Sequence, residues 1–173
     1  GSQERRRFLD RLVYSFDPAH AGRISAYNHA LRERTKLLTD AKLSGKIDDA
    51  WLSALEDALA TRGMAVAAAR LDVAQRLAGA FAQAHSAFPA CTLAIDGLAE
   101  GWLMDLPAVE VEDRLRRALK ASRGRDAQMG GAGNALEGRL PHQSDLLVTH
   151  AAKAMPAGQC STGEQKMLLV GLV

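Results

Sequence analysis

One stretch of sequence decides the fold: residues 51–80 read WLSALEDALATRGMAVAAARLDVAQRLAGA. Apolar side chains recur through it at steps of three, four or seven residues, which places them on one face of a helix. Residues 24–41 repeat this spacing, and the LSGK of residues 43–46 breaks it ahead of Asp48, a good helix cap. The pattern predicts an antiparallel helical hairpin with coiled-coil character, whose alanines let the backbones approach closely. The seam residues are Ile24, Tyr27, Leu31, Leu38, Ala41, Trp51, Leu55, Ala58, Ala65, Ala69, Val73, Leu77 and Ala80.

Two features of the predicted hairpin admit alternatives. Gly63 lies inside the second helix and costs about 1 kcal/mol of helix stability relative to alanine, so a broken helix competes with a continuous one. The apolar stripe of residues 51–84 is interpreted as packing against residues 24–41. A docking surface for a partner protein is the other interpretation of that stripe.

The composition is ordinary for a globular protein. The chain has 173 residues, with 22 Lys+Arg against 20 Asp+Glu, and is 47% hydrophobic and 24% charged. This predicts one domain, or one domain with an appendage, and excludes a globally disordered chain. The sequence has neither an apolar run long enough for a membrane span nor an apolar N-terminal secretory signal, so we expect a cytoplasmic protein with no membrane partner.

Cysteine and histidine show no arrangement typical of a metal or catalytic site. Cys91 and Cys160 are too few for a disulfide scaffold, and the five histidines lack metal-ligand spacing. No nucleophile, histidine and acid recur at a recognisable spacing. We therefore predict no metal site and no catalytic residue, and we interpret His142 as a structural hydrogen-bonding residue.

Changes in composition and apolar spacing divide the chain into four predicted segments. Residues 1–16 are predicted to form an amphipathic helix, and residues 17–86 an arm made by the hairpin. Residues 87–129 are predicted to be a strand followed by a basic helix that completes the arm. Residues 130–173 are predicted to be the start of a further, incomplete lobe.

Shorter signals refine these segments. Asp17 and Pro18 are expected to be the cap and the first turn of the first hairpin helix. Residues 87–96 and 145–150 are expected to be strands, the first because its apolar residues alternate. Residues 97–107 are expected to be a turn-rich connector in which Trp102 is either a core plug or an exposed anchor. Helices are expected over residues 108–120 and 161–173, and a flexible glycine-rich stretch over residues 129–134.

Two groups of basic residues are candidates for contacts with the DNA backbone. The first has no acidic residue between its ends, and its alternative is a solvated helix face. The second lies near the N-terminus. Aromatic residues are scarce in both, so any contact with DNA is expected to be independent of base sequence. The candidates are Arg114, Arg116, Arg117, Lys120, Arg123 and Arg125 in the first group, and Arg5, Arg6 and Arg7, with Arg11, in the second.

The segment STGEQK, residues 161–166, places a hydroxyl and a glycine at the predicted start of a helix. The free backbone N–H groups and partial positive charge of a helix N-terminus suit a phosphate group. The simpler alternative is a capping box, because Ser161 is followed three residues later by Glu164.

Three motifs, in order, resemble the RecF family of DNA repair proteins. STGEQK before an apolar helix resembles the signature motif of ATP-binding-cassette ATPases in the form that RecF uses. RRRFLD at residues 5–10 resembles an arginine pair followed by Phe-Leu-Asp in that family, and PHQSDL at residues 141–146 resembles its GPHR[SD]DL element. The chain departs from this pattern at Leu140, where the family has glycine, at Gln143, where it has arginine, and at Ser2, where it has proline.

The resemblance covers essentially the whole chain and implies a fold. It implies a mainly helical arm, a few short strands and part of an α/β ATPase head of the ATP-binding-cassette type. Residues 1–16 would be the helix that connects the ATPase lobe to the arm, and residues 130–173 the start of the lobe that carries the signature motif. Arg5 and Arg6 would brace the arm against the ATPase lobe, as an alternative to binding DNA.

The resemblance also implies a function in recombinational DNA repair and replication. RecF proteins are ATP-dependent DNA-binding proteins with weak DNA-stimulated ATPase activity, linked to gap repair, recombinase loading and the SOS response, and they act with RecO-like and RecR-like proteins. ATP and Mg²⁺ would be cofactors of the full-length protein. The signature motif would contact the γ-phosphate held by the opposite subunit and so complete an ATP-dependent homodimer. The residues implied in that contact are Ser161, Gly163, Glu164, Gln165 and Lys166.

Other ATPase motifs are absent from this sequence. There is no GxxxxGK[ST] phosphate loop (Walker A), and no apolar strand ending in Asp-Glu (Walker B) follows the signature. We therefore expect this chain alone to bind no cofactor and to hydrolyse no ATP. A stand-alone helical interaction module and a degenerate relative without nucleotide chemistry are the alternatives.

Overall fold

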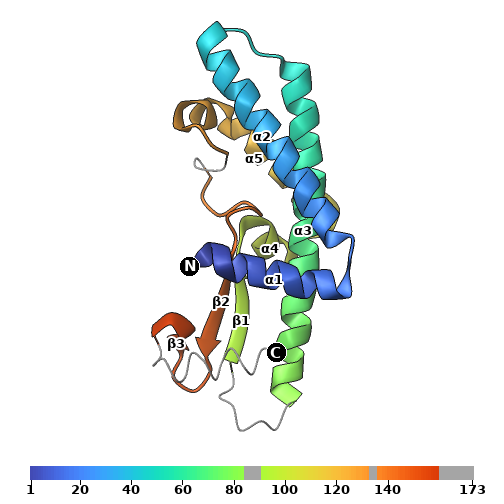
Figure 1. Cartoon of the computed structure of the whole chain (residues 1–173), viewed down its shortest axis with the longest axis vertical. Coiled ribbons are helices and arrows are strands. Elements are labelled where there is room, and N and C mark those ends of the chain that lie inside the picture. The colour runs from blue at the N-terminus through green and yellow to red at the C-terminus, as the bar shows by residue number, and fades with distance from the viewer. Residues whose placement is uncertain (84–90, 133–135, 160–173) are drawn as a thin grey trace.

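The computed structural model describes residues 1–83, 91–132 and 136–159. Within them the chain is mainly helical, with a small antiparallel sheet at one end of an elongated molecule (Figure 1). This confirms the predicted mainly helical class with a few short strands. The elements are α1 (Ser2–Phe16), α2 (His20–Ser44), α3 (Asp49–Gln83), β1 (Cys91–Asp96), α4 (Leu98–Leu103), α5 (Ala108–Met129), β2 (Asp145–His150), β3 (Met155–Pro156) and a 3-10 turn (Ala157–Gln159).

The predicted hairpin is present. Helices α2 and α3 lie antiparallel, side by side, and α5 packs against both (Figure 1). Gly45 ends α2 in the left-handed conformation, at φ 70°, which glycine adopts without steric cost. The Asp48 carboxylate accepts the backbone N–H of Trp51 at 2.9 Å and caps α3, as predicted.

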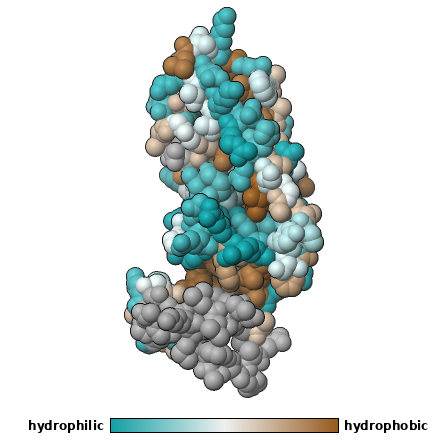
Figure 2. Space-filling model, viewed as in Figure 1, coloured by the Kyte–Doolittle hydropathy of each residue, from teal (hydrophilic) through white to brown (hydrophobic). Residues whose placement is uncertain are grey.

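Helix α3 is buried on several sides and not only along the seam with α2. Trp51, placed at the seam by its spacing, is 49% exposed near the hairpin tip, whereas Leu52 beside it is 1% exposed. The reason is that α3 packs against α1, α2, α4, α5 and β1, so its buried face spans several directions. Hydrophilic residues cover most of the arm's visible face (Figure 2).

Helix α3 continues through Gly63. A Cβ atom at this position would lie 3.1 Å from Cε2 of Tyr27 and 3.3 Å from Cγ of Pro141. Gly63 therefore allows α2 and the loop that precedes β2 to approach α3 closely, which explains a glycine inside a long helix.

Two local predictions were wrong. Pro18 lies in a turn, and α2 begins only at His20, because the Asp17 carboxylate binds the Ala19 N–H (3.1 Å) and Arg23 (2.6 Å) and holds a turn between the helices. The connector at residues 97–107 contains the short helix α4. Trp102 on α4 is partly buried against the core, with the Arg114 guanidinium carbon 5.8 Å from its ring centroid.

The sheet forms from strands that are distant in sequence. β1 pairs antiparallel with β2, from Cys91 opposite His150 to Asp96 opposite Asp145, and β2 pairs with β3. The strand prediction for residues 145–150 is confirmed, as is the described part of the other strand, residues 91–96. The sheet packs on α1 and α3 through Leu9, Val13, Val73 and Leu146.

One predicted helix is longer in the structure than expected, and several other predictions are not tested by it. The basic helix extends to Met129 instead of ending near Lys120, and Gly130 ends it at φ 70°. The helix predicted at residues 161–173 and the remainder of the glycine-rich stretch lie outside the described residues. The division into four segments stays a prediction. No helix in the described part of the chain combines the length and apolarity needed to cross a membrane.

Candidate functional site

The loop of residues 139–144, between α5 and β2, lies where α1, α2 and α3 meet. It carries the Pro-His-Gln-Ser part of one of the three motifs. The backbone N–H groups of Gln143 (2.7 Å) and Ser144 (2.9 Å) both donate to the carbonyl of Leu140, which makes a tight turn. Three helices then hold this turn through side chains.

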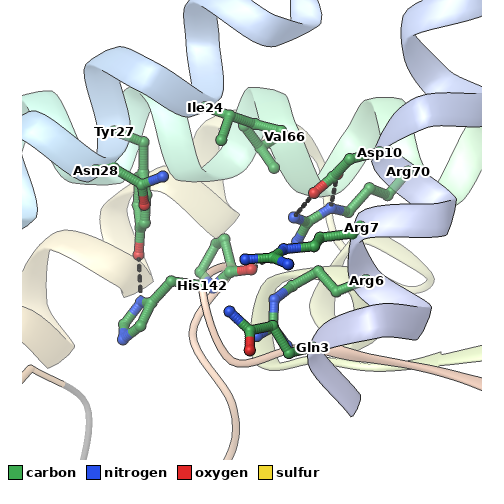
Figure 3. A pocket seen from close by; sticks show the side chains of 11 residues that line it. Gln3, Arg6, Arg7, Asp10, Ile24, Tyr27, Asn28, Val66, Arg70 and His142 are labelled. Carbon is green, nitrogen blue, oxygen red and sulfur yellow. Dashed lines mark hydrogen bonds and ion pairs between the residues drawn. The ribbon is translucent and has the colours of Figure 1, made fainter. Parts of the chain in front are cut away.

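We call the place where α1, α2, α3 and this loop meet the junction. Arg70 of α3 makes its central contacts (Figure 3). Its side chain is 3% exposed and donates to both carboxylate oxygens of Asp10 on α1, at 2.8 and 2.9 Å. It also donates to the Pro141 carbonyl at 2.6 Å and to Oγ of Ser144 at 2.8 Å. A planar guanidinium can make such a set because its N–H groups point in fixed, diverging directions. Arg70 therefore joins α1, α3 and the loop in one network.

The arginine pair of α1 braces the end of the same loop. Arg5 makes a two-point ion pair with Asp145, at 2.9 and 2.7 Å, and its guanidinium lowers the pKa of that carboxyl. Arg6 donates to the Ser144 carbonyl at 2.8 Å. These contacts fit the bracing interpretation of Arg5 and Arg6, and the DNA role predicted for them and for Arg7 stays a prediction.

His142 faces α2 from the other side of the loop. Its Nδ1 lies 3.1 Å from the Tyr27 hydroxyl, and Tyr27 is buried. Burial lowers the pKa of His142 to about 4, so its ring is neutral at pH 7. The structural hydrogen-bonding role predicted for His142 agrees with this geometry.

A second buried network joins the three arm helices. Arg34 of α2, with a fully buried side chain, donates to Glu56 of α3 at 3.0 Å, to Asp126 of α5 at 2.8 Å and to the Leu119 carbonyl at 2.6 Å. Arg123 also pairs with Glu56, at 2.6 Å. Every charge in this network has an opposite partner, and the pairs join α5 to both helices of the hairpin.

The six predicted DNA contacts on α5 do not form one uncompensated basic stripe. Three of them pair with acidic residues: Arg114 with Glu110, Arg116 with Asp57, Glu112 and Asp113, and Arg123 with Asp49 and Glu56. Arg117, Lys120 and Arg125 are exposed. Three of these acidic residues, Asp49, Glu56 and Asp57, lie on α3. The sequence of residues 114–125 therefore gives no sign of them.

The signature-motif residues lie outside the described residues, which end at Gln159 before this motif. The structure therefore leaves the predicted ATP contact of Ser161, Gly163, Glu164, Gln165 and Lys166 untested. Within the described ranges, no group of three or more His, Cys, Asp or Glu side chains is arranged to hold a metal ion.

The sequence did not single out Arg34, Arg70 or their acidic partners. One signal was present: Arg34 lies four residues from both Ala30 and Leu38 on the buried face of α2. Arg70 likewise follows Val66 by four residues on α3. A charged residue inside an apolar stripe indicates a buried partner, because an unpaired buried charge costs several kcal/mol.

The chain is similar along its whole length to curated proteins that are named DNA replication and repair protein RecF. It is 48% identical over 172 residues to the one from Mesorhizobium japonicum, which covers 98% of this chain and 43% of that protein. It is 48% identical over 174 residues to the one from Rhizobium etli, with 99% and 44% covered. The chain thus spans less than half the length of these relatives. No protein-family model matches it.

Solved structures share the fold. One, described as the recombination mediator protein RecF-ATP in the RecFOR pathway, matches with a TM-score of 0.82 over 99% of this chain and 44% of that one, at 18% identity. Another, described as RecF-ATPrS, also has a TM-score of 0.82, at 20% identity over 99% of this chain and 45% of that one. The predicted resemblance to part of a RecF protein is therefore confirmed at the level of the fold.

Proposed function

We propose that this chain, which belongs to the RecF family, is the arm and part of the ATPase head of a DNA replication and repair protein that binds ATP. The observation that carries this proposal is the similarity of the whole chain to RecF proteins, at up to 48% identity. The three sequence motifs that resemble RecF occur in the family order over the same length.

The junction at residues 139–144 suggests how the arm serves the head. Arg5, Arg6 and Arg70 fix the loop and the first residue of β2. The chain continues from β2 through β3 towards the signature motif. The network would therefore transmit the position of the arm to the segment that carries Ser161.

The ATP site of the full-length protein would be completed in trans. In this proposal Ser161, through its hydroxyl, and Gly163, through its backbone N–H, contact the γ-phosphate that the opposite subunit holds with Mg²⁺. Glu164, Gln165 and Lys166 would form the rest of that predicted helix start, where backbone N–H groups favour an anion. ATP would thereby join two copies head to tail, and hydrolysis, stimulated weakly by DNA, would separate them.

The cellular role follows from the family. The protein would act in the cytoplasm at gaps in DNA, help to load recombinase as part of gap repair and the SOS response, and work with RecO-like and RecR-like proteins. Contact with DNA would be independent of base sequence and run through basic side chains. On α5, the exposed Arg117, Lys120 and Arg125 are the candidates that no acidic partner compensates within the described residues.

Salt-dependent DNA binding tests this proposal. The fluorescence anisotropy of a labelled duplex is measured with the full-length protein at several salt concentrations. The slope of log affinity against log salt is negative, and each lost phosphate contact lowers its magnitude by about 0.9. The triple variant Arg117→Gln, Lys120→Gln, Arg125→Gln is therefore expected to bind more weakly, with a slope smaller in magnitude by about 2–3.

The matched control removes three exposed lysine charges from α2 and the hairpin turn, in the triple variant Lys36→Gln, Lys42→Gln, Lys46→Gln. It is expected to retain the slope of the wild type. Absence of DNA binding by the wild type would contradict the DNA-binding role itself. Equal losses in the two triple variants would contradict its assignment to α5.

A further inference from the structure

We propose that the cavity between α1, α2, α3 and the loop of residues 139–144 binds a phosphate group, supplied either by a free phosphate ester or by the DNA backbone. The cavity measures about 350 Å³. Figure 3 shows Gln3, Arg6 and Arg7 entering it from α1, with Tyr27 and Asn28 facing them from α2.

The cavity carries more positive than negative charge. Asp10 is the one carboxylate among the described lining residues, and both of its oxygens are occupied by Arg70. Oδ1 of Asp10 also lies 3.0 Å from Nε2 of His20. Asp10 and Arg70 thus cancel each other, which leaves the charges of Arg6 and Arg7 without a carboxylate partner in the cavity.

These two arginines retain N–H groups for a ligand. Arg6 donates to the Ser144 carbonyl through Nη1, and its Nε and Nη2 make no hydrogen bond to a described residue. Arg7 makes no hydrogen bond or ion pair within the described ranges. Burial and the nearby Arg70 lower the pKa of Arg6, which is the mark of a cation without enough compensation. A bound anion would relieve this penalty.

The chemistry of the lining favours a phosphate group over other ligands. A guanidinium offers a fork of N–H donors that matches two oxygens of a phosphate, and such charge-assisted pairs are strong. The side-chain amides of Gln3 and Asn28 add donors at the same cavity. His142 stays neutral, because burial lowers its pKa to about 4, and adds no charge of its own.

The remaining wall is apolar. Ile24 of α2 and Val66 of α3 line the cavity between the arginines of α1 and the residues that face them, so one side of a ligand would be shielded from water (Figure 3). The volume exceeds that of a single phosphate group and leaves room for the group esterified to it. The site requires neither ATP nor the signature motif, and only the DNA source of the phosphate rests on the proposed function.

Calorimetric titration with inorganic phosphate tests the site directly. The wild-type chain is expected to bind phosphate saturably, and Arg7→Gln to bind it at least about tenfold more weakly, because a charged hydrogen bond is lost. Arg7 is exposed, so this variant is expected to keep the far-ultraviolet circular dichroism and thermal midpoint of the wild type.

The control is Arg76→Gln, which removes an equal charge from the exposed face of α3, where Arg76 pairs only with Asp72. This variant is expected to bind phosphate as the wild type does. Absence of saturable binding, or equal affinities for Arg7→Gln and Arg76→Gln, would overturn the proposal.

A second titration, with a short DNA duplex, distinguishes the two sources. If phosphate competes with the duplex and Arg7→Gln weakens both, the DNA backbone supplies the group. If Arg7→Gln weakens phosphate binding alone, a free ester supplies it. Either result supports the cavity as a phosphate site. If the α5 triple variant loses DNA binding but still binds phosphate, the DNA contact of α5 and the phosphate site in the cavity are independent of each other.

Discussion

Arg70 of α3 and Asp10 of α1 form a two-point ion pair, at 2.8 and 2.9 Å, although 60 residues separate them in the sequence. Burial alone would raise the pKa of Asp10, but hydrogen bonds from His20 and Arg70 hold it below its usual value. The pair fixes α1 against the hairpin, and through Pro141 and Ser144 it also fixes the loop before β2.

Removing this guanidinium is expected to destabilise the chain strongly. Arg70→Met leaves the carboxylate of Asp10 and the carbonyl of Pro141 without their main donor, which costs about 3–5 kcal/mol for a broken buried pair. Urea denaturation at pH 7 measures the free energy of unfolding. The double variant Asp10→Asn, Arg70→Met should lose less than the sum of its single variants, because no charge is left unpaired.

The matched control for Arg70→Met is Arg76→Met, which breaks an exposed pair on the same helix. Such a pair contributes about 0–1 kcal/mol. If the two variants lose equal amounts of stability, the Arg70 network does not hold the junction.

Two glycines of α3 are expected to respond to alanine with opposite signs. At Gly79 no atom lies within 4 Å of an added Cβ, so Gly79→Ala should stabilise the helix by about 0.5–1 kcal/mol. At Gly63 the Cβ would press on Tyr27 and Pro141. Gly63→Ala should lower stability, and Gly63→Val should lower it by about 1–3 kcal/mol through overpacking.

Thermal denaturation of the three glycine variants compares these positions. The same helix and the same substitution are used at both sites, so helix propensity cancels from the comparison. Stabilisation by Gly63→Ala equal to that by Gly79→Ala would mean that the close approach of Tyr27 and Pro141 to α3 is not a constraint.

His142 is expected to make the stability of the chain depend on pH between about 6.5 and 4. Its folded-state pKa of about 4 lies below the ordinary histidine pKa of 6.5, so the unfolded chain binds more protons in this window. Stability from this group is full above pH 6.5 and is lost as the pH falls towards 4, by about 3 kcal/mol at about 1.4 kcal/mol per pKa unit.

Urea denaturation at pH 7, 6, 5 and 4.5 measures this dependence, and His142→Asn is expected to flatten it. The lowered pKa values of Asp10 and Asp145 act below this window, because both carboxyls already titrate below the ordinary value of 3.8. A slope that persists unchanged in His142→Asn would contradict the assignment of the dependence to this ring.

Local patterns were sufficient to predict the hairpin and both longer strands. The turn at Gly45 and the cap at Asp48 depend on neighbouring residues, as do the apolar steps along α2 and α3. Helix α4 was missed because it is short and contains a glycine, which weakens its helical pattern.

The junction was not predictable in the same way, because its partners are distant in sequence. The loop resembles a family motif, but its contacts are long-range: Arg5 and Asp145 are 140 residues apart, and Tyr27 and His142 are 115 apart. Arg34 and Arg70 were visible as charges within apolar stripes, yet only the fold brings their acidic partners to them.

ATP-dependent dimerisation of the full-length protein, followed by light scattering with and without ATP, tests the proposed trans ATP site most directly. ATP is expected to convert the wild type to a dimer, and Ser161→Arg is expected to stay monomeric while still binding ATP, because the arginine blocks the γ-phosphate of the opposite subunit. An unchanged ATP-dependent dimer in Ser161→Arg would contradict the proposal that this segment completes the ATP site in trans.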